Sequence, residues 1–96
     1  MKPKFNLGQC VATPGALEVL QESGQSPGDF LSRHVQGDWG EVCDDDKLVN
    51  DQSLIDGSRL LSAYRTSKGT KLWVLTEATD DHGQRAATTI LLPSEY

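Results

Sequence analysis

The stretch "RLLSAYRTSKGTKLWVLTEA", residues 59–78, decides the fold class. It contains two runs rich in leucine, aromatic and β-branched residues, and the "SKG" between them is a hairpin-turn signal. A third run, "AATTILLP" at 86–93, follows the polar loop "TDDHGQR", and Pro93 ends it because proline cannot donate to a strand ladder. The last third of the chain therefore predicts a three-stranded antiparallel meander.

Two helix patterns precede the meander, "TPGALEVLQESG" at 13–24 and "SPGDFLSRHVQG" at 26–37. Each begins with a capping hydroxyl residue followed by proline, and each ends at glycine. A third helix is expected to begin with Asp44 as its cap and to end at Gly57. Its apolar residues predict a buried side made of Leu48, Val49 and Ile55.

A short strand is expected near the beginning of the chain, because "FNLGQCVA" at 5–12 carries apolar residues at alternate positions. The elements together predict an α+β domain: an N-terminal strand, three short helices, then the meander, with the helices packed on one face of the sheet. A chain of 96 residues has room for one core, so residues 1–96 are predicted to form a single globular domain.

The charge balance narrows the classes of partner. Nine Lys and Arg residues stand against fourteen Asp and Glu residues, for a net charge of -5. Direct nucleic-acid binding draws its affinity from cations on phosphates, so this balance argues against it and favours a protein partner. Cys10 and Cys43 lack metal-ligand spacing, so no metal or other cofactor is expected. No segment approaches the roughly 20 apolar residues of a membrane span, and a cytoplasmic location is predicted.

The stretch "SRHVQGDWGEV" at 32–42 leaves two interpretations open. In the first, it is a helix end, and Trp39 folds back onto the core between flexible glycines. In the second, Trp39 is an aromatic anchor within an acidic, partner-binding surface. The residues predicted for that surface are Asp38, Trp39, Glu41, Asp44, Asp45 and Asp46. The three consecutive aspartates also suit the positive end of a helix without any ligand.

A metal-independent ribonuclease of the small-toxin type is the alternative. In that interpretation His34 is the acid or base, and a cationic side chain stabilises charge on the phosphate. The candidate catalytic residues are His34, Arg59, Tyr64 and Arg65. Arg59 and Arg65 are six positions apart on a predicted strand, which allows them to share a face.

Several segments together resemble a family of small bacterial "plasmid-related" proteins carried on plasmids and integrative elements. The resemblance extends over nearly the whole chain and rests on "GQCVATPGALEVL", "SRHVQGDWGEV", "NDQSLIDGSRLLSAY", "KLWVLTEA" and "TTILLPSEY". The loop at 79–85 is longer than the family's usual connection, so His82, Asp80 and Asp81 are not expected to be family features. The resemblance implies a mobile-element context and no particular activity.

These observations predict a small acidic interaction or regulatory module of a bacterial mobile element. It is expected to be non-enzymatic and to bind a protein, for example as a blocker of a host protein that itself binds nucleic acid.

Overall fold

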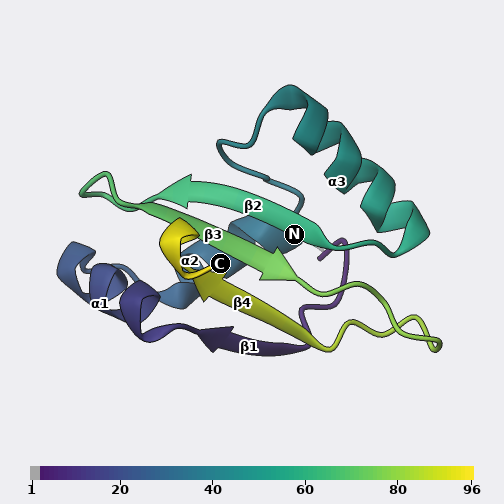
Figure 1. The fold of residues 1–96 in the computed structure, drawn as a ribbon, viewed down its shortest axis with the longest axis horizontal. Coiled ribbons are helices and arrows are strands. Elements are labelled where there is room, and N and C mark those ends of the chain that lie inside the picture. Colours follow the sequence, from purple (N-terminus) through teal and green to yellow (C-terminus); the bar gives the residue numbers. More distant parts are fainter. Residues whose placement is uncertain (1–2) are drawn as a thin grey trace.

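The computed structural model describes residues 3–96, and its centre is a four-stranded mixed sheet with the strand order β1-β4-β3-β2. Strands β2 (Leu60–Arg65), β3 (Lys71–Thr76) and β4 (Ala87–Leu91) form the predicted antiparallel meander. Strand β1 (Gln9–Ala12) lies parallel to β4 at one edge (Figure 1). It is shorter than predicted, because Gly8 turns the chain with a positive φ of 65°.

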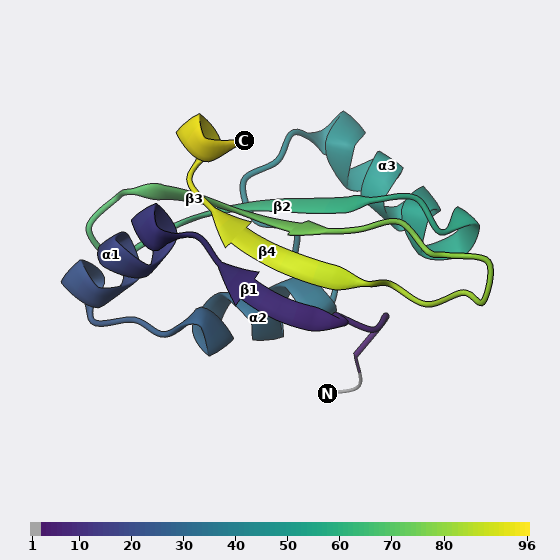
Figure 2. The same cartoon turned by 60° about the horizontal axis from the view of Figure 1, so that its bottom comes forward.

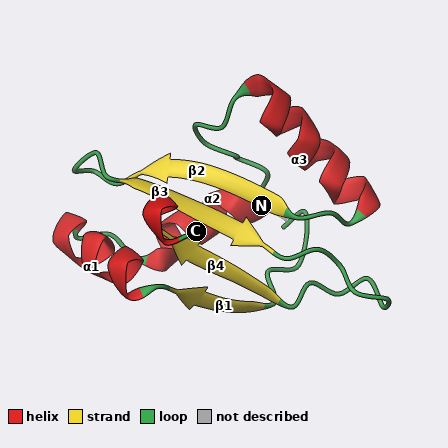
Figure 3. Cartoon of the chain, viewed as in Figure 1, coloured by secondary structure: helices red, strands yellow, loops and turns green. Residues whose placement is uncertain are grey.

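Three helices and a short C-terminal turn complete the α+β domain, as predicted (Figure 3). They are α1 (Pro14–Ser23), α2 (Pro27–Val35), α3 (Asp44–Asp56) and the 3₁₀ helix η1 (Pro93–Glu95). The Thr13 hydroxyl caps α1 by accepting from the backbone N–H of Ala16, as its sequence indicated. The cap of α3 is Cys43, one residue earlier than expected.

The sheet separates two unequal layers, which Figure 2 shows on either side of it. Helices α1 and α2 cover what we call the inner face, where Leu20 and Phe30 pack against the sheet. The strand residues of this core are Tyr64, Leu72, Val74 and Ile90. The predicted packing of helices on one face holds for α1 and α2, whereas α3 lies with η1 on the opposite side, the outer face. Within residues 3–96, no helix is both long and apolar enough to cross a bilayer.

Strand β2 is one edge of the sheet, and neighbouring segments occupy its outward backbone groups. The side-chain amide of Asn50, in α3, donates to the carbonyl of Leu61 at 2.8 Å and accepts from the Leu61 N–H at 3.2 Å. Two residues along, the N–H of Ala63 donates to the carbonyl of Trp39, and its carbonyl accepts from the N–H of Glu41. This edge is therefore covered, which prevents pairing with a foreign strand.

Replacing Asn50 by alanine is expected to lower the free energy of unfolding by about 2–3 kcal/mol, because it leaves the Leu61 N–H and carbonyl without partners. Urea denaturation followed by circular dichroism measures the change. The matched control is Gln52→Ala, at an exposed position of the same helix, where a change within about 0.5 kcal/mol is expected. Equal stability of the two variants would contradict the role assigned to Asn50.

Candidate functional site

The stretch at 32–42 ends α2 and starts a return toward β2. Gly37 and Gly40 both have positive φ angles, 84° and 73°. A side chain on Gly40 would also collide with the carbonyl of Ala63 and the ring of Tyr64. The glycines therefore let the chain pass against β2 and turn the Trp39 indole inward.

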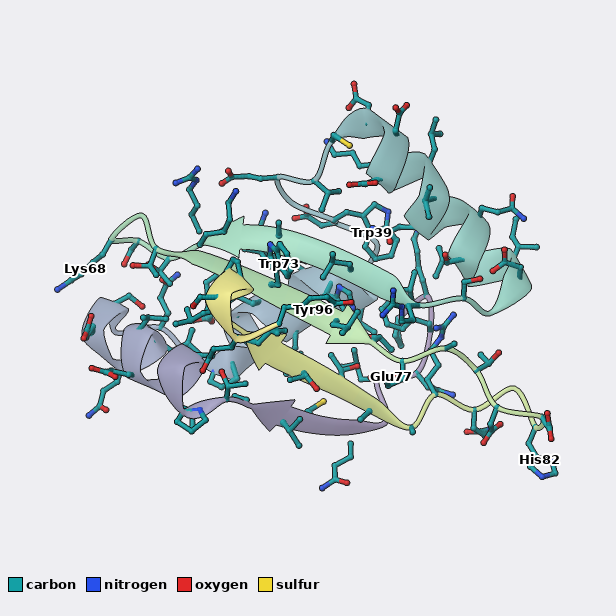
Figure 4. The ribbon with its side chains drawn as sticks, viewed as in Figure 1. Trp39, Lys68, Trp73, Glu77, His82 and Tyr96 are labelled. Carbon is teal, nitrogen blue, oxygen red and sulfur yellow. The ribbon has the colours of Figure 1, made fainter. Side chains whose placement is uncertain are left out.

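Trp39 is buried, with 4% of its surface exposed, and this corrects its prediction as an exposed anchor. Its ring lies edge-on to the imidazole of His34, with centroids 5.7 Å apart, and stacks near Phe5. Its indole N–H donates to the carboxylate of Asp51 at 3.0 Å. Figure 4 shows Trp39 between α3 and β2 in that view, where it serves as a core residue. The first interpretation of the stretch is therefore confirmed.

His34 is completely buried on the inner face and lies within a chain of hydroxyl groups. Its Nδ1 is 2.6 Å from the Ser62 hydroxyl, and its Nε2 is 2.8 Å from the Thr76 hydroxyl. Thr76 in turn lies 2.7 Å from Thr88, whose hydroxyl donates to the carbonyl of Leu7.

The order of donors along this chain follows from the Leu7 carbonyl, which can only accept. Thr88 uses its one hydroxyl proton on Leu7, so the hydroxyl of Thr76 donates to Thr88. Thr76 then accepts from Nε2–H of His34, and the hydroxyl of Ser62 donates to Nδ1. A neutral imidazole with its proton on Nε2 satisfies every partner.

Burial, together with the charge of Arg85, lowers the pKa of His34 from 6.5 to about 4. Arg85 is itself 6% exposed, and its guanidinium donates to the carbonyls of Ser53, Ser58 and Glu77. It thereby joins the C-terminal end of α3 to the β3–β4 connection. Sequence reasoning missed this structural role, since nothing in "TDDHGQR" distinguishes a buried arginine from an exposed one.

The sheet separates the residues proposed for ribonuclease activity. Arg59 and Arg65 share the outer face, as their spacing indicated, whereas Tyr64 packs into the inner core with His34 behind the same sheet. Arg59 donates to the hydroxyl of Tyr96, and Arg65 pairs with Glu41 at 2.9 Å. Burial raises the pKa of Tyr64 to about 12. His34 cannot touch a phosphate without opening of the core, so these four residues form no cleft together.

The acidic residues of the predicted surface divide into two kinds. Asp38 and Glu41 are exposed but paired, the first with Arg33 at 2.7 Å and the second with Arg65. Asp44, Asp45 and Asp46 form the exposed first turn of α3, where Asp44 lies 4.0 Å from Lys47. The free negative charge of this region is therefore concentrated at the beginning of α3. Among residues 3–96, no three His, Cys, Asp or Glu side chains are arranged to hold a metal ion.

The orientation of α3 is the reverse of the prediction. Leu48, Val49 and Ile55 are 67%, 59% and 81% exposed, so the expected buried side was wrong. The buried residues are the polar Asn50 and Ser53. Hydrogen bonds decide this orientation, because Asn50 binds the backbone of β2 and the carbonyl of Ser53 accepts from Arg85. A hydrophobic pattern cannot reveal a helix attached through polar groups.

A groove of about 260 Å³ lies beside α3 on the outer face. Its apolar walls come from Val49 on the helix and from Leu61 and Leu75 on the sheet. Tyr96 lies at its far side, with its ring edge-on to Trp73 at 5.5 Å (Figure 4). The polar residues Asp46, Asn50 and Arg59 complete the lining. The exposed apolar residues of α3 and this groove together form what we call the α3 surface.

Comparisons with family models, with curated proteins and with solved structures give no match to this chain. The likeness to plasmid-related proteins therefore stays a prediction from the sequence segments.

Lowering the pH from 7 to 4 is expected to destabilise the protein through His34. Its pKa is about 4 in the folded chain and near 6.5 when unfolded, so the unfolded state binds the proton first. The contribution of the neutral His34 to the free energy of unfolding is constant above about pH 6.5 and decreases toward pH 4. The total loss is about 3 kcal/mol. Urea titrations at a series of pH values measure it. The exposed His82 is the control: His82→Gln should keep the pH dependence, whereas His34→Gln should weaken it between pH 6.5 and 4.

Proposed function

We propose that this protein is a non-enzymatic interaction module that binds a protein partner with a basic surface through the α3 surface. The observation that carries the proposal is the orientation of α3, which buries Asn50 and Ser53 and exposes Leu48 and Val49. Exposed apolar residues on a helix have an unfavourable hydration free energy. Contiguous groups of them are typical of binding surfaces. The adjoining apolar groove extends this contact area.

Charge supports the chemical class of the partner. The three aspartates of the first turn of α3 are exposed next to the apolar residues, and the whole chain carries a net charge of -5. Apolar residues flanked by charge form the arrangement of an interface centre with a polar rim. A basic partner would gain attraction at that rim, mainly in its rate of association. A protein that normally holds nucleic acid has such a surface, in keeping with a blocker from a mobile element.

The anchor of this surface differs from the one that the sequence suggested. Trp39 holds α3 against the sheet, since its indole N–H donates to Asp51 of α3 and its backbone carbonyl accepts from the N–H of Ala63 in β2. The acidic residues Asp44, Asp45 and Asp46 keep the role proposed for them, and Leu48 and Val49 take that of the anchor. Asp38 and Glu41 are engaged with arginines and belong to the margin of the surface.

The double variant Leu48→Ser, Val49→Ser is expected to recover at least tenfold less of the partner protein than the wild type. The reason is that it removes the apolar centre of the α3 surface and leaves the buried side of α3 unchanged. Quantitative pull-down from a bacterial lysate, followed by mass spectrometry, measures the loss. The matched control is Gln21→Ser, at an exposed position of α1 away from both this surface and the β1 edge. Recovery of the same protein at equal levels by the folded double variant would contradict the proposal.

Charge is tested separately with Asp44→Asn, Asp45→Asn, Asp46→Asn. This triple variant should associate more slowly, and added salt should slow the wild type but hardly affect the variant. Association kinetics with the recovered partner, measured by surface plasmon resonance, show the difference. An identical salt dependence of the association rate for the wild type and the triple variant would contradict a basic binding surface on the partner.

A further inference from the structure

Strand β1 is the other edge of the sheet, and its outward backbone groups face solvent. The N–H of Gln9 donates to Ala86 and the N–H of Thr13 donates to Ile90, each at 3.0 Å. In a parallel pair, alternate residues direct both backbone groups to the same neighbour, so the groups of Cys10 and Ala12 face away from β4. Figure 2 shows β1 at the open margin of the sheet.

The two edges of the sheet differ in whether other parts of the chain cover them. Asn50 and the segment around Trp39 cover β2, whereas within residues 3–96 no strand lies beyond β1 in the sheet. Charged side chains, prolines and bulges commonly protect a free edge. None of them occurs in "QCVA" of β1, in which Cys10 is exposed and Val11 is 43% exposed. This edge is therefore ready to pair with an extended strand.

An apolar pocket lies along the same edge. Its lining comes from Cys10, Val11 and Ala12 of β1, Leu17 of α1, Pro27 and Leu31 of α2, and Ile90 of β4. A strand added to β1 would direct alternate side chains over this pocket. Because the pocket begins directly beside β1, a side chain that enters it from an added strand has little distance to cover. Small apolar side chains therefore suit this place.

A second copy of β1 can pair with this edge symmetrically, because the outward backbone groups belong to the two residues that flank Val11. Cys10 and Ala12 lie on either side of Val11, so an antiparallel partner centred on its own Val11 sets Cys10 opposite Ala12 twice. Each pair exchanges two backbone hydrogen bonds, which gives about four in all. The residues brought over the pocket are again the small Ala12 and Cys10. We propose that two copies of this chain pair through β1, antiparallel about a two-fold axis at Val11, to form one continuous eight-stranded sheet.

The contact is short, so the dimer is expected to dissociate on dilution. Each copy carries a net charge of -5, and the strand itself carries none. Screening of the repulsion between copies should therefore strengthen the pairing as salt is added. The opposite salt dependence is expected for the basic partner at the α3 surface, so the two proposals are tested independently.

Sedimentation equilibrium over a dilution series tests the pairing. The wild type should approach twice the protomer mass of 10.5 kDa at high concentration. Val11→Lys and Val11→Glu should each stay monomeric, because like charges then face each other across the axis, and an equal mixture of the two should recover the dimer. Val11→Thr, which keeps the branched shape, should still pair, and circular dichroism verifies that every variant is folded.

A cross-link tests the register. With Cys10 and Cys43 changed to serine, Val11→Cys should form a disulfide between copies, since non-hydrogen-bonded pairs lie at about 4.5 Å between Cα atoms. The matched control is Gln9→Cys in the same background. With the two-fold axis at Val11, position 9 of one copy lies far from position 9 of the other. A monomer at every concentration would overturn the proposal. So would a dimer that Val11→Lys leaves intact, or cross-linking of the Gln9 variant alone.

Discussion

The hydrogen-bonded chain from Ser62 through His34, Thr76 and Thr88 to the Leu7 carbonyl joins parts of the molecule that apolar packing does not hold in register. It connects α2 with β2, β3, β4 and the segment before β1. Each hydroxyl in it is buried, and its proton is committed in one direction. A shift of one strand by one residue would turn these hydroxyls to the outer face and leave His34 unsatisfied. The chain therefore specifies the pairing of strands as well as contributing to stability.

The strands could be predicted because their leucine, aromatic and β-branched residues form runs that turn residues bound. In β3, Leu72 and Val74 face the inner core, and Trp73 and Leu75 face outward, so residues 72–75 are apolar on both faces of the sheet. Both caps of α1 and the N-cap of α2 could be predicted for a similar reason, since Thr13, Gly24 and Ser26 act within a few residues of their own position. The C-cap of α2 is Gln36, one residue before the predicted Gly37. Local chemistry of this kind is visible in a single sequence.

The candidate site could be predicted only in part, because its decisive contacts are distant in the chain. Trp39 was correctly interpreted as a core residue in one of two alternatives, and its partners Phe5 and Asp51 lie on separate segments. The face of α3 was wrong, since Asn50 and Ser53 look like surface residues until β2 and Arg85 are beside them. The separation of His34 from Arg59 and Arg65 depends on the sheet as a whole. No local pattern carries this information.

The polar attachment of α3 also bears on how the domain opens. A helix that detaches from apolar packing exposes much new surface, so denaturant promotes its opening and the opening raises the heat capacity. Helix α3 is attached mainly through Asn50, Arg85 and the Trp39–Asp51 contact, and three of its apolar side chains, Leu48, Val49 and Ile55, already face water. Its detachment would expose little additional apolar area of the helix itself, and Trp39 would be the main apolar residue uncovered. Amide hydrogens of α3 should therefore exchange through a local opening that depends less on urea than the global unfolding of the sheet does.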